Sequence, residues 1–582
     1  MIHRSHGSAT GNPRPTPHLG PRARAAADTD LQRRCGKSSK AELRRGRPWG
    51  GALAAALLLC GGACTAAVRP DMLPSSSAAP LEAAVGAHPV AFLDRLGWGA
   101  DAGELQHLRQ VGALRFLQEQ LHPLPDSGVP GSVARALARL PVNRPLSQWL
   151  PTQIAAQRAL FRARHQARTG APSAQSLQGR LKALQGRMSA LTRQAMTEQL
   201  LLALYAQDQL RQRLIWFWMN HFNVFRGGTL GPMMADYRQR VIAPHALGHF
   251  RSLLQATMFS PQMLLYLNNA QNHRGHINEN YAREVMELHT VGLGAGYSQR
   301  DVTDLAHVLT GLGVDLTARP VWVPPKLRAW VWQRGLVLFN PLRHDPEPEQ
   351  VLGQTFSGRG VGELKRILTL LADDPATARH ISFELAQYFV ADHPSPALVS
   401  AMVHTWLNTQ GDITAVLQTM FTSPQFAASL ARPQFKDPMR YVLSAVRASF
   451  EGRYITHPQP LLGMLYRLGE PLYGRQTPDG YPLNSGAWNS PGQLTTRFAV
   501  AQQLAAGAPL LFHRPRRPVS ALAAMRRGRP ARLGRPPDLA HSAVYAAIEA
   551  SLSRSTRRAL AQSRGRVRWN ALWLSSPEFM TD

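Results

Sequence analysis

The stretch NENYAREVMELHTVG, residues 278–292, contains two glutamates three positions apart and a histidine shortly after them. Carboxylates serve as general bases, and carboxylates together with imidazoles serve as metal ligands. At about 100° per residue, Glu284 and Glu287 share one face of a helix, whereas His289 falls on the apolar face. The two glutamates can therefore act on one ligand. His289 is predicted to be a hydrogen-bonded core residue or to lie where the helix ends.

The polar face of this helix has two interpretations, and the pattern leaves both open. In the first it is a solvated surface, stabilised by an i, i+4 ion pair between Arg283 and Glu287. In the second it belongs to a binding or catalytic site that includes Asn280, Arg283, Glu284 and Glu287. Periodicity alone favours the solvated surface, so the second interpretation requires functional residues from other elements.

The segment IWFWMNHFNVF supplies such candidates. Asn220 and His221 lie among aromatic residues, and His221 continues the helical stripe of Leu214 and Phe217, so it points where core residues point. A histidine in this position is more often structural than catalytic. Polar groups among aromatic side chains are costly to bury unless they meet polar partners, which keeps both residues as site candidates.

Two further pairs could bind a metal ion. His245 and His249, in PHALGHF, have the i, i+4 spacing of zinc-binding histidines, but the glutamate of the His-Glu-x-x-His motif is absent. His344 and Asp345, in the loop PLRHDPEPEQ, could bind a divalent metal, transfer protons or cap a turn. A divalent metal is the one cofactor that the sequence indicates. Neither a Gly-x-x-x-x-Gly-Lys loop nor a Gly-x-Ser-x-Gly elbow occurs, which excludes the commonest nucleotide-binding and serine-hydrolase classes.

The charge of the chain is strongly positive, with a formal net value of +30 over 582 residues. Residues 1–50 contain 11 Lys or Arg against 3 acids, and residues 513–582 contain 14 against 4, so the two ends account for +18. The remaining surplus is spread over the middle of the chain and includes no basic motif of a known nucleic-acid-binding module. Because the excess is almost entirely arginine, which a GC-rich coding bias also produces, no nucleic-acid partner is predicted.

The first part of the chain is typical of an exported protein. Residues 43–67 have the pattern of a signal peptide, with arginines before an apolar run that is too short to span a bilayer. A periplasmic or extracellular protein with no membrane span after cleavage is therefore expected. The lack of cysteine after Cys64 fits an oxidising compartment. Lipidation at Cys64 is the alternative, although the usual leucine is missing. The polar leader, residues 1–42, is attributed to a mis-assigned start codon.

Helical periodicity extends over most of the remaining chain, so the predicted fold class is mostly α. A linker rich in Pro, Ser and Ala is expected at residues 68–87, followed by a large multi-helix domain at residues 88–505. Residues 506–582 are expected to form a basic, partly disordered region that ends in a short helix. Strand signals predict at most a small β-hairpin near residues 321–340. Repeated Ser-Pro-Gln, Ser-Pro-Glu and Asp-Pro phrases predict helix starts.

Several of these segments, taken together and in order, resemble the domain of unknown function 1800 family of bacterial proteins. The matching phrases include WFWMNHFNVF, NENYAREVMELHTVG, RHDPEPEQVLG, DDPATARHISFELAQYFVADHP and RLGEPLYGRQTPDGYP, between about His88 and Ala505. Positions shared with the family pattern are Asn220, His221, His245, Glu279, Asn280, Arg283, Glu284, Glu287, His289, His344 and Asp345. The chain departs from the pattern at Glu347 and Glu349, where the family tends to have glycine and then lysine, and at His249.

The resemblance implies export, and it implies a partner, because such proteins are often encoded beside a sulfatase-like exported family, the domain of unknown function 1501 family. The leading hypothesis is a hydrolase that acts on an extracellular polymer or ester. Its expected pocket lies where the helix of residues 278–290 meets the helix of His221 and the loop of His344, with Glu284, Glu287 and His221 as catalytic residues. The alternatives are a non-catalytic partner or scaffold of the sulfatase-like protein and a divalent-metal-binding protein without turnover.

Overall fold

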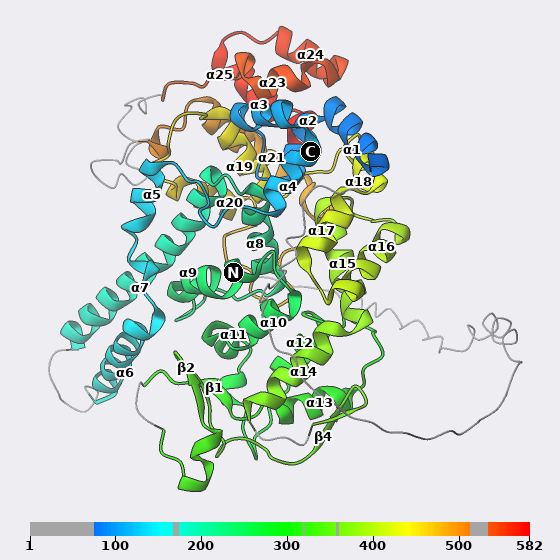
Figure 1. Ribbon diagram of the computed structural model, residues 1–582. Coiled ribbons are helices and arrows are strands. Elements are labelled where there is room, and N and C mark those ends of the chain that lie inside the picture. Colours follow the sequence, from blue (N-terminus) through cyan, green and yellow to red (C-terminus); the bar gives the residue numbers. More distant parts are fainter. Residues whose placement is uncertain (1–74, 167–173, 318–320, 357–359, 513–533) are drawn as a thin grey trace, which may run out of the picture. The chain divides into compact units, whose positions relative to one another are not determined.

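Helices that bury one apolar face account for most of the regular structure in the computed structural model, which confirms the mostly α prediction (Figure 1). The described residues are 75–166, 174–317, 321–356, 360–512 and 534–582, and all of them belong to one unit, Met72–Asp582. The expected leader (residues 1–42) and signal peptide (residues 43–67) lie outside the described residues. No helix in the described ranges is long and apolar enough to cross a bilayer.

The first four helices show where the expected linker was wrong. Residues 68–87 were expected to form a linker, but α1 (Ser75–Ala87) occupies most of this range. Its Leu81 and Val85 are one turn apart and buried, because a short Ala-rich helix needs only two such anchors to pack on a core. Three short helices follow it: α2 (Pro89–Leu96), α3 (Ala102–Val111) and α4 (Ala113–Leu121).

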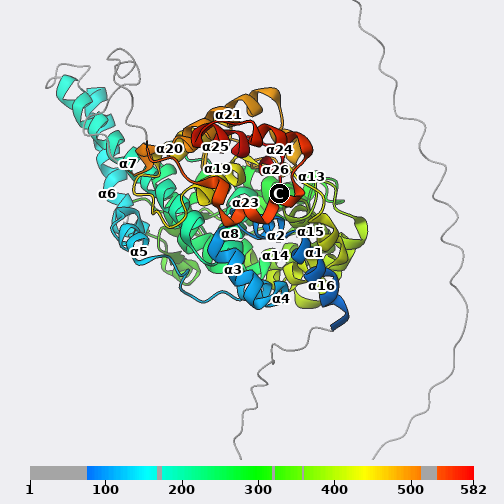
Figure 2. The same cartoon turned by 90° about the horizontal axis from the view of Figure 1, so that it is seen from above.

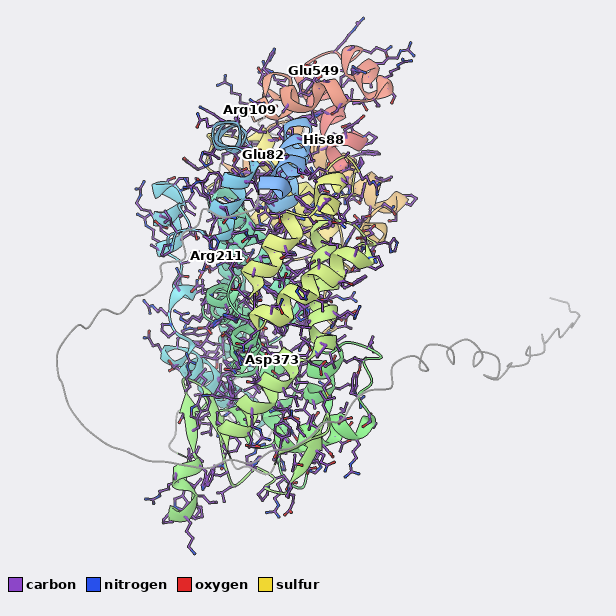
Figure 3. All side chains as sticks on the ribbon, turned by 45° about the vertical axis from the view of Figure 1, so that its right-hand side comes forward. Glu82, His88, Arg109, Arg211, Asp373 and Glu549 are labelled. Carbon is purple, nitrogen blue, oxygen red and sulfur yellow. The ribbon has the colours of Figure 1, made fainter. Side chains whose placement is uncertain are left out.

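Glu82 of α1 fixes how α1 meets α4. Its two carboxylate oxygens accept the backbone N–H groups of Ala113 and Leu114, at 2.9 Å each. These N–H groups belong to the first turn of α4 and have no partner within that helix, and an acidic group is favoured there by the helix dipole. Figure 3 labels Glu82 at this position.

Longer helices follow. They are α6 (Leu150–Gln166), α7 (Ala174–Tyr205) and α8 (Gln209–His221), preceded by the short α5 (Gly131–Ala138). The other helices are α9 (Met234–Asp236), α10 (Phe250–Met258), α11 (Pro261–Tyr266), α12 (Asn280–Glu287), α13 (Gln299–Val308), α14 (Val361–Asp373), α15 (Pro375–Phe389), α16 (Pro396–Thr409), α17 (Ile413–Phe421), α18 (Pro424–Ser429), α19 (Pro438–Ser449), α20 (Gln459–Arg467) and α21 (Pro491–Ala505).

The repeated Ser-Pro phrases start helices, as predicted. Ser260, Ser423 and Ser576 accept the N–H group three residues ahead, with the proline in the first turn of the helix. Asp374 caps α15 in the same way through the N–H of Ala376, at 2.7 Å. These residues therefore carry local structure and no chemistry.

Within the described ranges, the strands form two small antiparallel sheets rather than a single hairpin. The predicted hairpin near residues 321–340 is confirmed as β2 (Trp332–Arg334) and β3 (Val337–Phe339), which turn at Gly335 with a positive φ of 60°. β3 also pairs with β1 (Leu312–Val314). β4 (Glu349–Val351) pairs with β5 (Gln354–Phe356). Strands of three residues are too short to show a period-2 pattern in the sequence.

The helical body extends beyond residue 505, where the domain was expected to end. Described residues 534–582 form α23 (Ala543–Ile548), α24 (Arg554–Ala561), α25 (Arg566–Leu574) and α26 (Pro577–Met580), and α25 packs on α21. Trp573 of α25 is fully buried, and its ring lies 5.0 Å from that of Phe579. The arginine-rich composition concealed these aromatic anchors.

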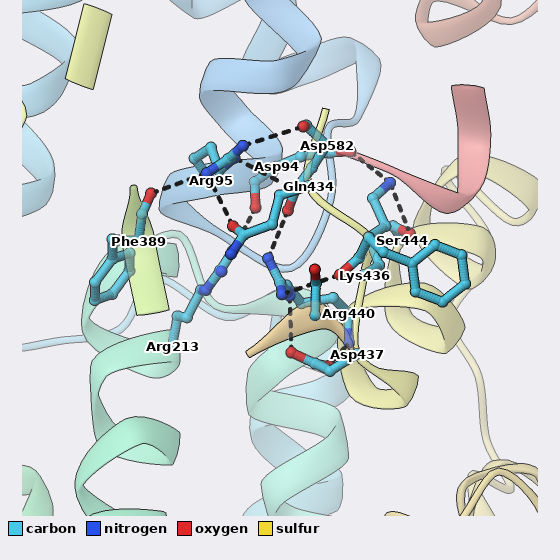
Figure 4. A network of polar contacts seen from close by, with 12 residues as sticks. Asp94, Arg95, Arg213, Phe389, Gln434, Lys436, Asp437, Arg440, Ser444 and Asp582 are labelled. Atoms are coloured by element: carbon cyan, nitrogen blue, oxygen red, sulfur yellow. Dashed lines mark hydrogen bonds and ion pairs between the residues drawn. The ribbon is translucent and has the colours of Figure 1, made fainter. Parts of the chain in front are cut away.

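A buried network of ion pairs joins this C-terminal part to the first helices (Figure 4). Arg95 of α2 lies with its Nε 3.0 Å from Oδ1 of Asp582, and Arg440 of α19 donates from Nη1 to Oδ2 of the same carboxylate at 2.8 Å. Lys436 Nζ lies 2.6 Å from Oδ2 of Asp94. All five side chains are nearly inaccessible to solvent.

Arg213 connects α8 to the same region. It donates to the backbone carbonyls of Asp94 and Gly97, at 2.9 Å for Gly97, and its guanidinium lies 4.9 Å from the centre of the Tyr388 ring. Tyr388 belongs to α15, so one cation holds α2, α8 and α15 together.

Replacing Asp582 tests the weight of this network. Asp582→Asn removes the carboxylate that Arg95 and Arg440 share and leaves two buried cations short of a partner. We expect the free energy of unfolding to fall by about 3–5 kcal/mol in urea titrations. Asp538→Asn, which removes an exposed ion pair with Arg566, serves as the control and should cause no measurable change. A loss for Asp582→Asn no larger than that of the control would contradict the assigned role.

Candidate functional site

His221 ends α8 on the side that faces the core, as its helical stripe predicted. Its imidazole stacks on Phe217, with 6.3 Å between ring centres, and packs edge-on against Phe222 at 4.6 Å. The side chain is only 2% exposed. A polar ring in such surroundings needs polar partners at both nitrogens.

Glu384 of α15 is the main polar partner of His221. Its Oε2 lies 2.7 Å from Nδ1 of His221, and its Oε1 lies 3.4 Å from Nε2 of His380. His380 and Glu384 are one helical turn apart, so the regular spacing of α15 sets their geometry. One carboxylate therefore bridges two imidazoles that come from different helices.

The far nitrogens of both imidazoles face the segment that follows α12. Nε2 of His221 lies 3.3 Å from the carbonyl oxygen of His289, and Nδ1 of His380 lies 2.8 Å from that of Thr290. α12 stops at Glu287, and the N–H of His289 still bonds back to the carbonyl of Glu284. The end of this helix thus presents two carbonyls to the histidines. The predicted meeting of the 278–290 helix with the His221 helix is found here.

The charges of the bridge follow from these contacts. Burial raises the pKa of Glu384, but the charge and hydrogen bond of His221, together with those of His380, outweigh it and hold that pKa well below its usual range. Burial lowers the pKa of His380, yet Glu384 and the Thr290 carbonyl raise it above the ordinary histidine value. Because both nitrogens of His380 face acceptors, the doubly protonated ring fits best. The result is an anion held beside a cation.

His289 behaves as the helical wheel predicted for a core residue. It is 1% exposed, and burial followed by the nearby His221 keeps its pKa well below the usual histidine value. Its ring centre lies 5.8 Å from that of His221, and Nε2 has no hydrogen-bond partner among the described residues. His289 is therefore neutral, and it contributes its backbone carbonyl to the site.

A small hollow opens beside the Glu384 bridge. Its volume is about 50 Å³, and it is lined by Phe217, Asn220, His221, Leu288, His380, Glu384, Asp479, Tyr481 and Leu483. The side chains of His380 and Glu384 are 22% and 24% exposed, so both are open to solvent, in contrast to His221. Asp479, in the segment of residues 471–490 that precedes α21, forms the second carboxylate of the hollow.

Asn220 fixes the loop that carries Asp479. Its Oδ1 accepts the N–H of Tyr481 at 2.6 Å, and its Nδ2 donates to the carbonyl of Tyr481 at 2.9 Å. Gly480 has a positive φ of 70°, and a Cβ there would lie 2.4 Å from the Asn220 carbonyl, so only glycine fits. Asn220, predicted as a binding residue, thus positions the loop.

Asp479 is held ionised by its own loop. Burial raises its pKa, but hydrogen bonds from Arg475 and Thr477 outweigh this and lower it below the usual range. Arg475 donates from Nε and Nη2 to the two oxygens of the carboxylate, at 3.1 and 2.6 Å.

Glu284 and Glu287 are half-buried, and neither lines the hollow. The pKa of Glu284 is raised by burial, by Glu287 and by Asp479, and Arg283 opposes these effects only in part. Glu284 therefore lies within electrostatic range of Asp479. Among the described residues, no hydrogen bond or ion pair joins either glutamate to His221.

The predicted ion pair between Arg283 and Glu287 is wrong. Arg283 donates from Nη2 to Glu279 at 2.9 Å, and Gln299 of α13 accepts from the same nitrogen at 3.0 Å. The hydroxyl of Thr303, on α13, donates to Oε1 of Glu279 at 2.8 Å. Packing of α13 thus holds Glu279, four residues before Arg283, in the position where it pairs with Arg283. Periodicity within one helix could not show this. Asn280 has a local role and donates to the carbonyl of Leu267 at 3.2 Å.

The histidine pair His245 and His249 does not lie on one regular helix. A short 3₁₀ turn ends at His245, and α10 begins only at Phe250, because the chain between them turns at Gly248. The i, i+4 geometry required for zinc is therefore absent. The pKa of His245 is lowered by burial and by Arg334.

His344 and Asp345 lie at the end of α13 and have different partners. Nδ1 of His344 lies 3.0 Å from the carbonyl of Thr310, while Oδ2 of Asp345 lies 2.9 Å from Nδ1 of His307. Neither makes a hydrogen bond, ion pair or ring contact with His221 or Glu284 in the described part of the chain. His344 also does not line the hollow beside His221, so the expectation that its loop joins the His221 pocket is not met. The carbonyl of Thr310 already serves as the hydrogen-bond partner of the buried His344 ring.

No group of three or more His, Cys, Asp or Glu side chains within the described ranges is arranged to hold a metal ion. His307 contacts two carboxylates, with Asp345 at 2.9 Å and Glu349 at 3.4 Å. Glu349 stands where lysine was expected from the family resemblance, and it pairs with His307.

A sequence profile described as "Protein of unknown function (DUF1800)" matches residues 91–581, which is nearly the whole chain. The chain belongs to the DUF1800 family. No curated protein and no solved structure matches it significantly. Because the profile extends to residue 581, the last helices of this DUF1800 protein belong to the family's own unit.

Three residues of the DUF1800 site were not among the predicted ones: His380, Glu384 and Asp479. All three lie in segments that carry the family resemblance, DDPATARHISFELAQYFVADHP and RLGEPLYGRQTPDGYP. The i, i+4 spacing of His380 and Glu384 was a detectable signal. Nothing in the spacing showed that His221, 159 residues before His380 and 163 before Glu384, would meet them.

The Glu384 bridge predicts a pH-dependent contribution to stability. The lowered pKa of Glu384 stabilises the fold above about pH 4.5, and this contribution is lost as the pH falls through the folded-state pKa. The raised pKa of His380 stabilises the fold below about pH 6.5, and this is lost as the pH rises through its folded-state pKa. The bridge is therefore strongest between these values.

Urea titrations of the wild type and Glu384→Gln across pH 3–8 check this expectation. The difference in unfolding free energy between the two proteins should be largest near pH 5–6 and shrink on both sides. Glu347→Gln, at an exposed glutamate, should match the wild type throughout. A difference that does not change with pH would contradict the charged bridge.

Proposed function

We propose that this DUF1800 protein is a hydrolase that uses acid–base chemistry at the hollow beside Glu384. The observation that carries this proposal is the Glu384 carboxylate, which bridges His221 and His380 on the wall of a hollow that also contains Asp479. Buried charge of this kind is costly to maintain for structure alone, and displaced pKa values concentrate at functional sites.

The size of the hollow points to water as the group that it holds. Its volume of about 50 Å³ exceeds the share of one liquid water molecule, roughly 30 Å³, and is far below that of a typical ligand pocket. A substrate must therefore present its reactive bond at the mouth. Hydrolysis needs only a water molecule, a proton acceptor and a proton donor at that point.

The side chains divide these tasks according to charge and exposure. His380, protonated and partly exposed, donates a proton to the leaving oxygen. Asp479, ionised and on the opposite loop, accepts a proton from the attacking water. Glu384 keeps His380 protonated, and His221, which is almost fully enclosed, holds Glu384 in place. Pairs of groups whose pKa values are displaced in opposite directions are typical of acid–base pairs.

In this proposal Glu284 and Glu287 act at the mouth of the hollow. Burial, together with the charge of Glu287, raises the pKa of Glu284 and makes it a second proton donor. The substrate class remains that proposed from the sequence, an extracellular polymer or an ester.

Export belongs to the same proposal. The signal-peptide pattern at residues 43–67 supports a periplasmic or extracellular location, and the cysteine-free body from residue 65 onward suits an oxidising compartment. Lipidation at Cys64 remains the alternative form of the exported protein.

Activity assays on the purified protein test the proposal with 4-nitrophenyl esters and 4-methylumbelliferyl glycosides. Glu384→Gln and His380→Gln should each lower kcat by about 100- to 10,000-fold, since each removes a charged partner from proton transfer. Loss of the His380 proton should lower kcat of the wild type as the pH rises above neutral. His404→Gln, at an exposed histidine on α16, and Glu347→Gln serve as matched controls.

Turnover within threefold of wild type in both Glu384→Gln and His380→Gln, or no turnover of any substrate by the wild type, would contradict the hydrolase. Stable co-purification with a sulfatase-like exported protein of the domain of unknown function 1501 family, without turnover, would support the scaffold alternative. Stoichiometric divalent metal by elemental analysis, again without turnover, would support the metal-binding alternative.

A further inference from the structure

The helical hairpin of α6 and α7 carries a large uncompensated positive charge. Residues 150–193 contain eight Lys or Arg and no Asp or Glu. This stretch therefore holds +8 of the +12 surplus between residues 51 and 512. Figures 1 and 2 both show α6 and α7 side by side, and they pack on each other. We refer to α6 together with residues 174–193 of α7 as the cationic arm.

The described cations of the arm are exposed and lack acidic neighbours. Six side chains in the arm are described and exposed: Arg158, Arg162, Arg180, Lys182, Arg187 and Arg193. Glu198, the first acid after the arm, already pairs with Arg238 at 3.4 Å and accepts a hydrogen bond from Gln239 at 2.7 Å. None of the six has an ion-pair partner among the described residues.

The cations form separate rows along the helices. On α7, Arg180 and Arg187 lie within about 20° of each other and about 10 Å apart along the axis. Lys182 and Arg193 form a second row about 16 Å long, nearly on the opposite side of the helix. Arg158 and Arg162, at i, i+4, form a third row on α6. The charge thus surrounds the arm and does not make a single flat patch.

A groove lined by apolar, polar and cationic side chains runs between the two helices. Its volume is about 480 Å³, and its lining includes Phe161, Leu184 and Met188 together with Arg193 and Arg226. The Phe161 side chain is 44% exposed. Gln157, Gln185, Ser189 and Thr192 also line the groove. This mixture of apolar, hydrogen-bonding and cationic groups suits a polymer whose units have apolar faces, hydroxyl groups and anionic substituents, as the rings of acidic sugars do.

We propose that the cationic arm binds an acidic polysaccharide, a polymer of sugars that bear carboxylates. Arginine favours this partner, because its planar guanidinium forms paired hydrogen bonds with carboxylates. A flexible chain can contact rows on several sides of a helix, whereas a rigid duplex can lie against one row only. Single-stranded nucleic acid would require aromatic platforms for base stacking, and Phe161 is the one large aromatic exposed in the described part of the arm.

The arm is connected to the site through the chain itself. Arg226, at the groove, follows His221 by five residues, so at most about 18 Å of extended chain separates them. The backbone N–H of Arg226 donates to the carbonyl of Tyr473, in the loop that carries Asp479, at 3.0 Å. A polymer held on the arm would therefore pass near the hollow. Binding by the arm does not depend on whether the hollow is catalytic.

Two full-length variants with the same change in charge test the proposal. The arm variant combines Arg180→Glu, Lys182→Glu, Arg187→Glu and Arg193→Glu. The control variant reverses four exposed cations on separate elements: Arg109 (labelled in Figure 3), Arg274, Lys365 and Arg467. Each set contains three arginines and one lysine, so net charge is matched. Circular dichroism and elution volume confirm folding of both.

Titration of fluorescently labelled polygalacturonate at several salt concentrations gives the result. We expect the arm variant to bind about tenfold or more weakly than the wild type. The slope of the logarithm of the binding constant against the logarithm of salt concentration should correspond to about three to four fewer released ions. The control variant should stay within about threefold of the wild type. Equal weakening of both variants, or unchanged binding by the arm variant, would overturn the proposal. Arm-dependent binding of duplex DNA in preference to polygalacturonate would overturn it in favour of nucleic acid.

Arginine protection on the unaltered protein gives an independent answer if the arm variant does not fold. Phenylglyoxal labels exposed arginines, and bound polygalacturonate should slow labelling of Arg180, Arg187 and Arg193. Arg109 and Arg467 should be labelled at the same rate with and without the polymer. Equal protection at all five positions would refute a specific arm site.

Discussion

The shared carboxylate of Asp582 is the interaction on which the rest of the structure depends. It pairs with Arg95 and Arg440, from helices separated along the chain by more than three hundred residues, in surroundings that exclude water. Such ion pairs contribute little net stability compared with apolar packing, but removing one partner leaves a buried charge without compensation. The network therefore determines which segments pack together, while it adds little to the net free energy of that packing.

α8 transmits this constraint to the site. Arg213 and His221 lie eight residues apart on that helix, or about 12 Å, so a helix fixed by Arg213 also fixes His221. Phe217 lies between them and packs against Tyr388 at 5.3 Å, and Tyr388 is one turn after Glu384 on α15. The two helices that meet at the Glu384 bridge are thus held by packed aromatic rings and by a cation, not by the bridge alone. Because this packing holds both helices in place, the charged groups of the site can stay close together without rearrangement of the helices that carry them.

The sequence indicated which residues lie on each face of a helix, but it did not indicate which residues of other helices that face contacts. Local signals were sufficient for the serine caps, for the core-facing position of His221 and for the enclosed ring of His289, because these depend on residues a few positions apart. The partner of His221 lies on another helix, and the i, i+4 pair of His380 and Glu384 looks like any ion pair on a helix surface until the fold brings it to His221. The same limit led to the wrong partner for Arg283 and to the wrong location for the His344 loop. Composition also misled at the C-terminal end, where arginines obscured the buried aromatic residues.

The position of Asp582 also determines when the protein can finish folding. Arg95 must wait for a residue 487 positions later in the chain before its carboxylate partner exists. At about 5–20 residues per second, synthesis of that interval takes roughly 25–100 s. During this time Arg95 of α2 lacks the carboxylate with which it pairs, and a buried charge without its partner is costly, so the packing around Arg95 is completed only after residue 582 has been synthesised. The carboxylate of Asp582 thus makes the final packing around Arg95 depend on a residue that is synthesised late.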